Sequence, residues 1–486
     1  MCCNFVRRDH HYSTSSLISN GYEVSTCPWR RCPHTLGIYI DDSLTRRTFG
    51  NKVFKYLRAA EICDLASDHN IAFAVNSDTS IAQVDRNDMI SKIQNTGRKV
   101  FVISMHGNIR MDDLRRMLAK DLSDPSLPLT DADFHAYRTS HEFNRFQAHQ
   151  QIIPPVLRES KFLTYGVNQC VPFQRETLPI VAAFDRCVYR ACIDTDYYDI
   201  AALESLSGNP RLSQAVAIVE IRISSPTQQA RARSQIEFAK FLATHASHEH
   251  ITKPYGTFAL RSVYPGETTH YLVTELPRKN LSVFFQSTDP QSTDSWLHRQ
   301  LHGLTAALAL IHMPTNGRFG IHHDIRPTKI AVCWNGEFTF KLAPSPQSRV
   351  VAQDGQALSG NSATVSPYHP PESTSGLSLS RRHDVWSLGC LLLETIVWYT
   401  KGKEAYTHFL ETASGKDRPQ HWFIVESGQL VLQAAVKKQL ATLQACGNGK
   451  WAYMVGIIRR MLATDPSSRI TASELVIALR DSTRPS

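Results

Sequence analysis

The chain has 486 residues and a formal net charge of +9 at pH 7, and 42% of its residues are hydrophobic. These fractions are typical of a globular protein with room for about two to three domains. No stretch approaches the roughly 18 apolar residues of a membrane span, and the polar first residues predict no secretory signal. Eleven scattered cysteines favour reduced thiols over a disulfide framework. We therefore expect an intracellular, cytoplasmic protein without a transmembrane segment.

The first 60 residues hold more than half of the positive excess, with nine Lys and Arg against four Asp and Glu. A basic segment can contact nucleic acid or an anionic membrane. A solvated segment is the favoured interpretation, because no nucleic-acid motif or aromatic interleaving accompanies the charge. We predict that residues 1–35 are disordered, and we expect no specific nucleic-acid partner.

Residues 36–150 are predicted to form a mainly helical accessory region. Apolar residues recur at helical spacing between residues 43 and 66, and residues 111–118 have the pattern of an amphipathic helix. Pro125 and Pro128 then interrupt the regular structure.

From residue 160 the pattern changes to short strands followed by helices. Strand-like runs occupy residues 181–193, 215–223 and 271–276, with a helix over residues 230–244. Asn335 and Gly336 divide an alternating run into a predicted hairpin, and helices predominate after Ser380. This order predicts an α+β fold of two lobes, a β-rich lobe over about residues 160–276 and a helical lobe over about residues 280–480.

Four motifs carry a resemblance to eukaryotic protein kinases. Residues 320–329 read GIHHDIRPTK and resemble the catalytic loop His-Arg-Asp-Leu-Lys-Pro-x-Asn. Residues 366–372 (SPYHPPE), 384–390 (DVWSLGC) and 465–469 (DPSSR) resemble later motifs of the same family, in the same order. The resemblance covers roughly residues 160–480 and implies a two-lobed kinase fold. Residues 127–157 are also similar to the leader of kinase-like proteins of filamentous fungi.

The resemblance implies a role for five residues of the helical lobe. Asp324 corresponds to the family's proton acceptor for the substrate hydroxyl, and His322 to a structural residue of the loop. Asp384 corresponds to the buried aspartate that braces the catalytic loop, and Glu372 and Arg469 to a buried ion pair. The last three indicate the fold and not activity.

In the β-rich lobe the resemblance places Thr274 at the gatekeeper position and Glu275 in the hinge. Glu237 is the candidate partner of the ATP-binding lysine, with a solvated helix glutamate as the alternative. Val219 stands where the family has that lysine, and Arg222 could replace it only with a shift in register. Residues 180–187 contain no glycine where the family has its phosphate-binding loop.

Two positions for magnesium ligands are also changed. Lys329 stands at the metal-binding asparagine, and Pro344 at the metal-binding aspartate of the Asp-Phe-Gly motif. The sequence therefore predicts a pseudokinase that regulates or scaffolds protein partners, with no cofactor and no metal. The alternative is an active or weakly active Ser/Thr kinase that uses ATP and Mg²⁺ with Asp324 as its base.

Overall fold

The computed structural model divides the chain into two compact units, Met1–Arg47 with Val53–Pro155 and Thr48–Lys52 with Val156–Ser486. The residues that it describes are 36–49, 52–129, 133, 141–158, 162–167, 173–179, 188–193, 198–199, 215–223, 225–261, 267–290, 293–353, 366–374, 380–414, 422–446 and 450–481. The predicted disorder of residues 1–35 and the changed phosphate-binding loop at residues 180–187 therefore lie outside the described residues. None of the described helices is long and apolar enough to cross a membrane.

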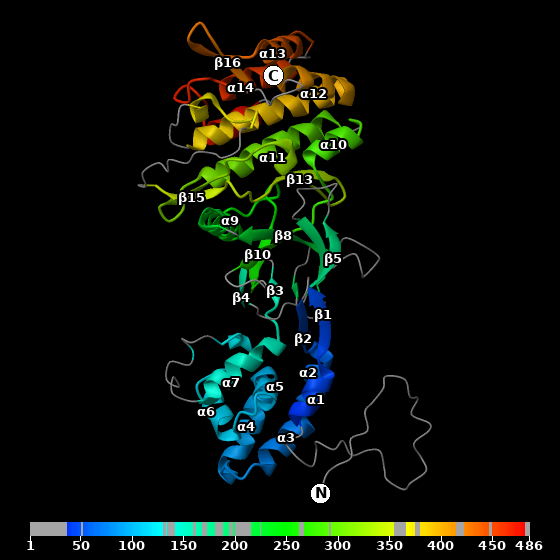
Figure 1. Ribbon diagram of the computed structural model, residues 1–486, viewed down its shortest axis with the longest axis vertical. Helices are drawn as coiled ribbons and strands as arrows, with labels where there is room; N and C mark the ends of the chain where they lie inside the picture. The colour runs from blue at the N-terminus through cyan, green and yellow to red at the C-terminus, as the bar shows by residue number, and fades with distance from the viewer. Residues whose placement is uncertain are drawn as a thin grey trace, which may run out of the picture. The chain divides into compact units, whose positions relative to one another are not determined.

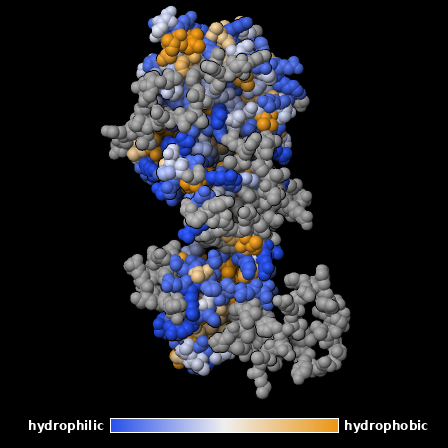
Figure 2. Space-filling view, in the orientation of Figure 1, coloured by the Kyte–Doolittle hydropathy of each residue, from blue (hydrophilic) through white to orange (hydrophobic). Residues whose placement is uncertain are grey.

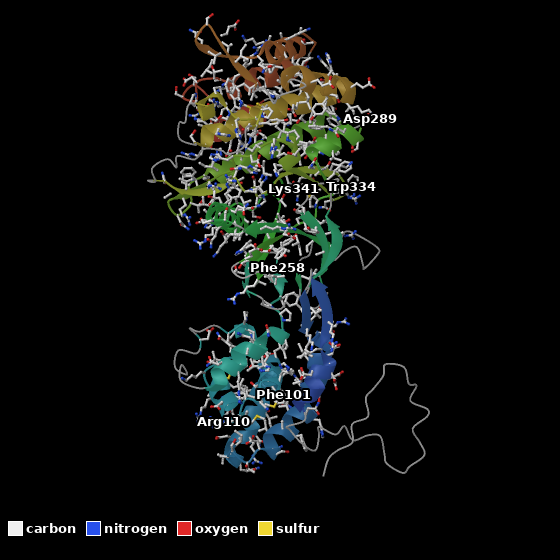
Figure 3. All side chains as sticks on the ribbon, viewed as in Figure 1. Phe101, Arg110, Phe258, Asp289, Trp334 and Lys341 are labelled. Carbon is white, nitrogen blue, oxygen red and sulfur yellow. The ribbon has the colours of Figure 1, made fainter. Side chains whose placement is uncertain are left out.

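The first unit is mainly helical. Its α-helices are α1 (Leu36–Ser43), α2 (Ala59–Leu65), α3 (Asp68–Ser77), α4 (Gln83–Thr96), α5 (Arg98–His106), α6 (Met111–Leu118) and α7 (His141–His149). Helix α5 forms the centre, and every residue from 100 to 105 is buried, including Phe101 (Figure 3). Asp124 caps this helix, since its carboxylate accepts hydrogen bonds from the backbone N–H groups of Lys99 and Val100, each at 3.0 Å.

The helical structure predicted between residues 43 and 66 was wrong for the first part of that range. Residues there form a two-stranded sheet of β1 (Thr45–Phe49) and β2 (Lys52–Tyr56), and the helix begins only at α2. In β2 burial alternates, with Phe54 and Tyr56 buried and Val53 exposed. That alternation has a period of two, and the apolar residues of this region also match helical spacing in the sequence.

The second unit begins with a β-rich lobe. Six strands form one sheet in the order β4-β9-β10-β8-β6-β5. Their bounds are β4 (Leu163–Val167), β5 (Phe173–Pro179), β6 (Val188–Ile193), β8 (Ala215–Ile223), β9 (Pro254–Arg261) and β10 (Thr268–Thr274); β3 (Leu157–Arg158) pairs with β7 (Tyr198–Asp199). Helix α9 (Pro226–His245) packs on β8 and β9 (Figure 1), and Ser225 caps it by accepting a hydrogen bond from the N–H of Gln228.

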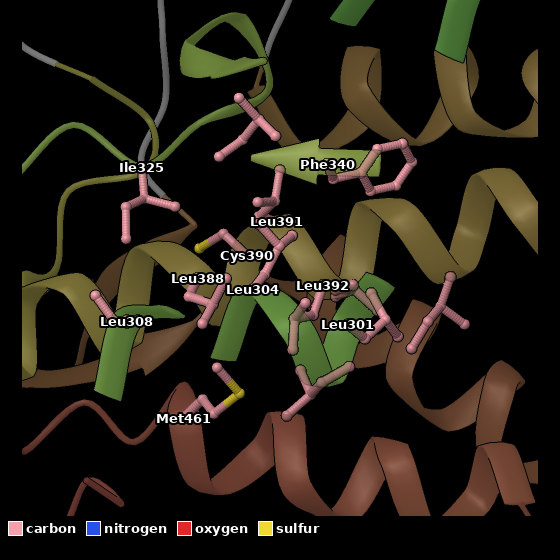
Figure 4. Close-up of a cluster of buried hydrophobic side chains, with 14 of the residues drawn as sticks. Leu301, Leu304, Leu308, Ile325, Phe340, Leu388, Cys390, Leu391, Leu392 and Met461 are labelled. Atoms are coloured by element: carbon pink, nitrogen blue, oxygen red, sulfur yellow. The ribbon is translucent and has the colours of Figure 1, made fainter. Parts of the chain in front are cut away.

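The C-terminal lobe is helical. It contains α10 (Leu281–Ser287), α11 (Asp294–His312), α12 (Arg381–Ser414), α13 (Ala434–Cys446), α14 (Lys450–Met461) and α15 (Ala472–Asp481). Its core is built mainly from α11, α12 and α14, where Leu301, Leu304 and Leu308 of α11 lie among the leucines of α12 and Met461 (Figure 4). Within α12 the backbone breaks at Gly402, whose φ is +81°.

Short strands complete this lobe. The bounds are β11 (Lys279–Asn280), β12 (Arg318–Ile321), β13 (Ile330–Trp334), β14 (Phe338–Leu342), β15 (Arg349–Ala352), β16 (Phe423–Glu426) and β17 (Gln429–Leu432). Strands β13 and β14 form the hairpin predicted at Asn335-Gly336, and Gly336 has a φ of +80°. The β16–β17 hairpin interrupts a region that the sequence predicted as predominantly helical. The second unit is thus the two-lobed α+β fold expected from the sequence.

Candidate ligand-binding cleft

A cavity of about 530 Å³ lies within the second unit, between the six-stranded sheet and the segment that follows the catalytic-loop motif. Both lobes line it: strands β6, β8 and β10 and helix α9 from one, and residues 329–346 from the other. A concave site of this size, shared by two lobes, suits a small organic ligand. Thr274, the residue predicted at the gatekeeper position, lines this cavity and is buried.

Strand β8 presents an apolar face to the cavity. Ala217, Val219 and Ile221 line it at alternate positions, as the period of a strand requires. Val219 pairs with Leu272 and Ala217 with Thr274 across the antiparallel β8–β10 ladder. Val219, which the resemblance places at the ATP-binding lysine of the family, therefore faces the cavity.

Arg222 also lines the cavity, but at an exposed position. Its side chain is 75% exposed, and Nε donates to Oε1 of the buried Glu220 at 2.5 Å. The two residues lie on the same strand, so this ion pair holds the arginine at the rim. Arg222 is consequently not placed as a buried substitute for the lysine.

Helix α9 faces the cavity with residues at helical spacing. These are Gln228, Arg231, Ala232 and Gln235. Glu237, the candidate partner from the sequence, is not among the lining residues; its carboxylate is half exposed and forms an ion pair with Arg318. The correction follows from helix geometry, because two residues along a helix turn a side chain by about 200°. Gln235 therefore occupies the buried, cavity-facing position, and the solvated alternative describes Glu237 better.

The catalytic-loop motif is held by Asp384. Its carboxylate accepts hydrogen bonds from the backbone N–H groups of His322, at 2.8 Å, and His323, at 2.7 Å, and from His312 Nε2 at 2.9 Å. Burial opposes its charge, but the His312 hydrogen bond and the neighbouring imidazoles hold the pKa of Asp384 below its ordinary value. His322 Nε2 in turn donates to the carbonyl of Ala343 at 2.8 Å. The loop backbone is thereby fixed to the segment carrying Pro344.

Both oxygens of the Asp324 carboxylate already have a partner. Arg326 Nε donates to Oδ1 at 2.7 Å, and the Ser345 hydroxyl donates to Oδ2 at 2.7 Å. Only 10% of the Asp324 side chain is exposed. Each carboxylate oxygen has room for two hydrogen bonds, so Arg326 and Ser345 fill one acceptor site on each oxygen. These contacts join the catalytic-loop motif to Ser345.

The metal positions of the family do not suit a divalent cation in this chain. Lys329 and Pro344 both line the cavity, so an ammonium group and an apolar ring replace the amide and carboxylate oxygens that Mg²⁺ prefers. Of the described residues that line the cavity, Glu220 alone is acidic, and it is paired with Arg222. Among the described residues no group of three or more His, Cys, Asp or Glu could hold a metal ion.

The hinge residue Glu275 has a structural partner. Lys341 Nζ contacts both of its carboxylate oxygens, at 2.7 and 3.0 Å, and the lysine is almost completely buried. Burial opposes the lysine's charge, but Glu275 raises the pKa of Lys341 above its ordinary value. The Glu275 N–H donates to the carbonyl of Lys253. Its carboxylate thus joins the segment that follows β10 to β14, where Lys341 lies (Figure 3).

Glu372 and Arg469 are not among the residues that line the cavity, and they form a buried ion pair with two hydrogen bonds. Arg469 Nη1 and Nη2 lie 2.6 and 3.0 Å from the two carboxylate oxygens. The guanidinium also donates to the carbonyls of Arg382 and Ala463. This pair ties the Pro-Pro-Glu motif, which ends at Glu372, to the loop before α15.

Sequence reasoning missed three residues that shape the site. Arg231 and Gln235 on α9 and Ser345 beside Asp324 have no motif to mark them. The helical spacing of Arg231 and Gln235 with Gln228 was present in the sequence, but only the fold shows which face of α9 meets the sheet. The contact of Ser345 with Asp324 depends on two segments 21 residues apart in the chain.

Two lobes, a braced catalytic-loop motif and the Glu372–Arg469 pair define the protein kinase fold. A model of the protein kinase domain matches residues 209–478, which is more than half of the chain. The chain belongs to the protein kinase domain family.

Three curated relatives show the range of similarity. Mitogen-activated protein kinase MPS1 of Pyricularia oryzae is 26% identical over 283 residues, covering 55% of this chain and 64% of the relative. Mitogen-activated protein kinase spm1 of Cytospora mali is 25% identical over 279 residues with the same coverage. GLH-binding kinase 1 of Caenorhabditis elegans is 25% identical over 221 residues, covering 45% of this chain and 54% of the relative. The chain thus spans less than two thirds of the length of these relatives.

Proposed function

We propose that the kinase domain of this chain is a pseudokinase that regulates or scaffolds protein partners inside the cell and does not transfer phosphate. The observation that carries the proposal is the make-up of the cleft. Val219, Pro344 and Lys329 stand at the three positions that neutralise phosphate charge directly or through a metal. Phosphoryl transfer depends almost entirely on such positioning and electrostatic stabilisation, so their joint loss removes most of the available catalysis.

The environment of Asp324 supports the same proposal. Each carboxylate oxygen of Asp324 already accepts one hydrogen bond, from Arg326 or from Ser345, so a substrate hydroxyl would have to share an oxygen with one of these donors. The retained motif residues instead serve the fold, since Asp384 and the Glu372–Arg469 pair organise the backbone. A stable two-lobed scaffold without catalytic activity is well suited to binding other proteins.

A weakly active Ser/Thr kinase is the second candidate. It is favoured by one observation, the position of Asp324 in a loop that Asp384 braces through two backbone hydrogen bonds. In that case ATP and Mg²⁺ would be required, and displacement of Ser345 or Arg326 would free a carboxylate oxygen.

Radiolabelled phosphate transfer distinguishes the two functions. The full chain and an Asp324→Asn variant are purified in parallel and assayed on a generic protein substrate and on the chain itself. The asparagine keeps the size of the side chain but cannot accept the proton. We expect any residual signal to be the same in both preparations, because it comes from a contaminating kinase. Loss of the signal in the variant alone, with an unchanged melting temperature, would establish the second candidate instead.

A further inference from the structure

Three buried histidines from separate segments meet beside the catalytic-loop motif. His323 belongs to that motif, His369 lies just before the short helix Pro371–Thr374, and His383 lies in the first turn of α12. The centroid of the His383 ring is 4.9 Å from that of His323 and 5.2 Å from that of His369. All three residues are less than one tenth exposed. The proposed function uses none of these rings, which we call the imidazole cluster.

Two rings of the imidazole cluster have a buried nitrogen without a partner. Nε2 of His323 and Nε2 of His383 form no hydrogen bond within the part of the chain that the structure describes. A neutral imidazole carries one N–H group, whereas an imidazolium carries two, and a buried N–H without an acceptor is costly. Protonation of either ring would therefore place a charge on a group whose Nε2 has no described acceptor.

The charges around the imidazole cluster also oppose protonation. The described groups that act most strongly on the rings of His323 and His383 are Asp384, Arg349, Arg469 and the imidazoles of His322 and His369. Asp384 is the anion in this set, but its carboxylate already accepts three hydrogen bonds. Arg349 and Arg469 are cations, so they repel an added positive charge. These neighbours together favour neutral rings.

Burial gives the imidazole cluster a defined dependence on pH. It lowers the pKa of His323 from 6.5 to about 4, and it lowers the pKa of His383 well below 6.5. The unfolded chain therefore binds protons near pH 6.5 that the folded cluster does not bind. The stability that the neutral rings contribute is fully present above pH 6.5 and is lost as the pH falls from 6.5 towards 4. For each histidine the equilibrium constant changes by about ten-fold per pH unit in this range.

The imidazole cluster connects residues 366–374 to the catalytic-loop motif. The Ser387 hydroxyl donates to the carbonyl of Tyr368 at 2.8 Å, and Glu372 is held by Arg469, so both sides of His369 are fixed to the C-terminal lobe. The His369 ring itself packs on His383, which packs on His323 of the motif. Every residue from 369 to 372 is buried.

We propose that the imidazole cluster holds residues 366–374 against the catalytic-loop motif at neutral pH and releases them as the pH falls. A charged ring cannot stay in this contact without an acceptor, so the segment opens locally before the lobe unfolds. Opening exposes residues that are buried at neutral pH and changes the surface that the lobe offers to partners. The inference goes beyond the pseudokinase function, because it concerns a conformational change and is independent of phosphoryl transfer.

Hydrogen exchange of the full chain tests this opening. Exchange is followed by mass spectrometry in residues 366–374 and in α15 at about pH 7.5 and about pH 5.5, and each rate is divided by the intrinsic rate at that pH. We expect the corrected rate in residues 366–374 to rise by about ten-fold at the lower pH. Helix α15 lies in the same lobe and contains no histidine, so its corrected rate should not change. A constant rate in residues 366–374, or an equal rise in α15, would overturn the proposal.

Two variants and a matched control identify the rings. His383→Phe keeps an aromatic ring and removes the titrating nitrogens. His323→Asn removes the neighbouring ring, and asparagine tolerates the φ of +59° at this position. Each variant should reduce the rise in residues 366–374 to about two-fold or less. His408→Phe makes the same substitution at an exposed position of α12 and should keep the rise of the parent.

The comparison between proteins isolates the imidazole cluster from other titrating groups. Glu394, which binds the Tyr368 hydroxyl, titrates in the parent and in every variant, so its contribution cancels. An undiminished rise in both His383→Phe and His323→Asn, or a lost rise in His408→Phe, would contradict the assignment to these rings. If His383→Phe melts below the parent at neutral pH, His323→Asn and the exchange of the parent decide the question.

Discussion

At the scale of single residues, Arg469 is the clearest case of a buried charge that must keep its partner. It is 1% exposed, and Glu372, which it contacts at two points, is also buried. Arg469→Ala leaves the Glu372 carboxylate buried and unpaired and frees two backbone carbonyls. We expect a loss of about 3–5 kcal/mol in the free energy of unfolding.

Chemical denaturation of the full chain measures this loss. Arg459→Ala provides the control, because Arg459 is exposed on the neighbouring helix α14 and its removal should change stability by less than about 0.5 kcal/mol. Equal stability of Arg469→Ala and the parent would mean that the ion pair contributes nothing to the lobe.

Glu394 gives the fold a predictable dependence on pH. It lies completely buried on α12 and accepts a hydrogen bond from the Tyr368 hydroxyl at 2.7 Å. Burial raises the pKa of Glu394 to about 8, from an ordinary value of 4.5. The folded state therefore keeps a proton that the unfolded state releases. The stability that protonated Glu394 contributes is fully present below pH 4.5 and is lost as the pH rises through about 8.

Glu394→Gln keeps an acceptor for Tyr368 and removes the titration. Relative to the parent, this variant should gain stability as the pH rises from about 5 to 8, by an amount on the order of a few kcal/mol. Melting temperatures of both proteins across this pH range test the expectation. A difference that stays constant with pH would show that Glu394 titrates normally.

At the scale of elements, replacement by alanine of two glycines in neighbouring helices should change the free energy of unfolding in opposite directions. A Cβ on Gly389 of α12 would lie 2.9 Å from Cβ of Met461 and 3.1 Å from Cδ2 of Leu462. A Cβ on Gly456 of α14 would meet nothing within 4 Å. Gly389 therefore permits close packing of α12 on α14, whereas Gly456 only weakens its own helix.

Gly389→Ala should lower the free energy of unfolding by about 1–3 kcal/mol through overpacking. Gly456→Ala should raise it by about 0.5–1 kcal/mol, because alanine favours the helix. Denaturant midpoints of the two variants and the parent give the comparison. A stabilised Gly389→Ala variant would contradict the close approach of the two helices.

The elements also show what the sequence could and could not predict. The α6 bounds and the Asn335-Gly336 hairpin followed from local signals, since helical spacing and a turn dipeptide act over a few residues. The β1–β2 sheet was missed because a short apolar run fits both periods. For Glu237 and Gln235 the helix itself was predicted, but its rotation against the sheet depends on packing between segments distant in the chain.

An exposed hairpin in the C-terminal lobe was also not predicted from the sequence. Ile424, Val425 and Leu430 of β16 and β17 are 41%, 69% and 37% exposed, and Figure 2 shows apolar surface in this part of the molecule. The alternating signal is short and lies between strongly helical segments, so the helical neighbours dominated the prediction.

At the scale of the whole kinase domain, the cleft depends on residues from both lobes, and its charge can be changed at two of them. Pro344→Asp together with Lys329→Asn restores one carboxylate and one amide oxygen at the family's metal positions. We expect this double variant to gain ATP binding that requires Mg²⁺ and that the parent lacks. Lys329→Asn alone should gain little Mg²⁺-dependent binding, because a single amide is a poor magnesium site.

The double variant should still fail to transfer phosphate. Val219 leaves the lysine position apolar, and Arg326 continues to occupy one oxygen of Asp324. Calorimetry with and without Mg²⁺ measures ATP binding by the parent, the single variant and the double variant. Radiolabelled phosphate transfer by the same three proteins measures catalysis separately. A double variant that melts as the parent does but shows no dependence on Mg²⁺ would contradict the assignment of Lys329 and Pro344 to the metal positions. Phosphate transfer by the double variant would show instead that metal binding alone was missing, and that the β-rich lobe still supports catalysis without its lysine.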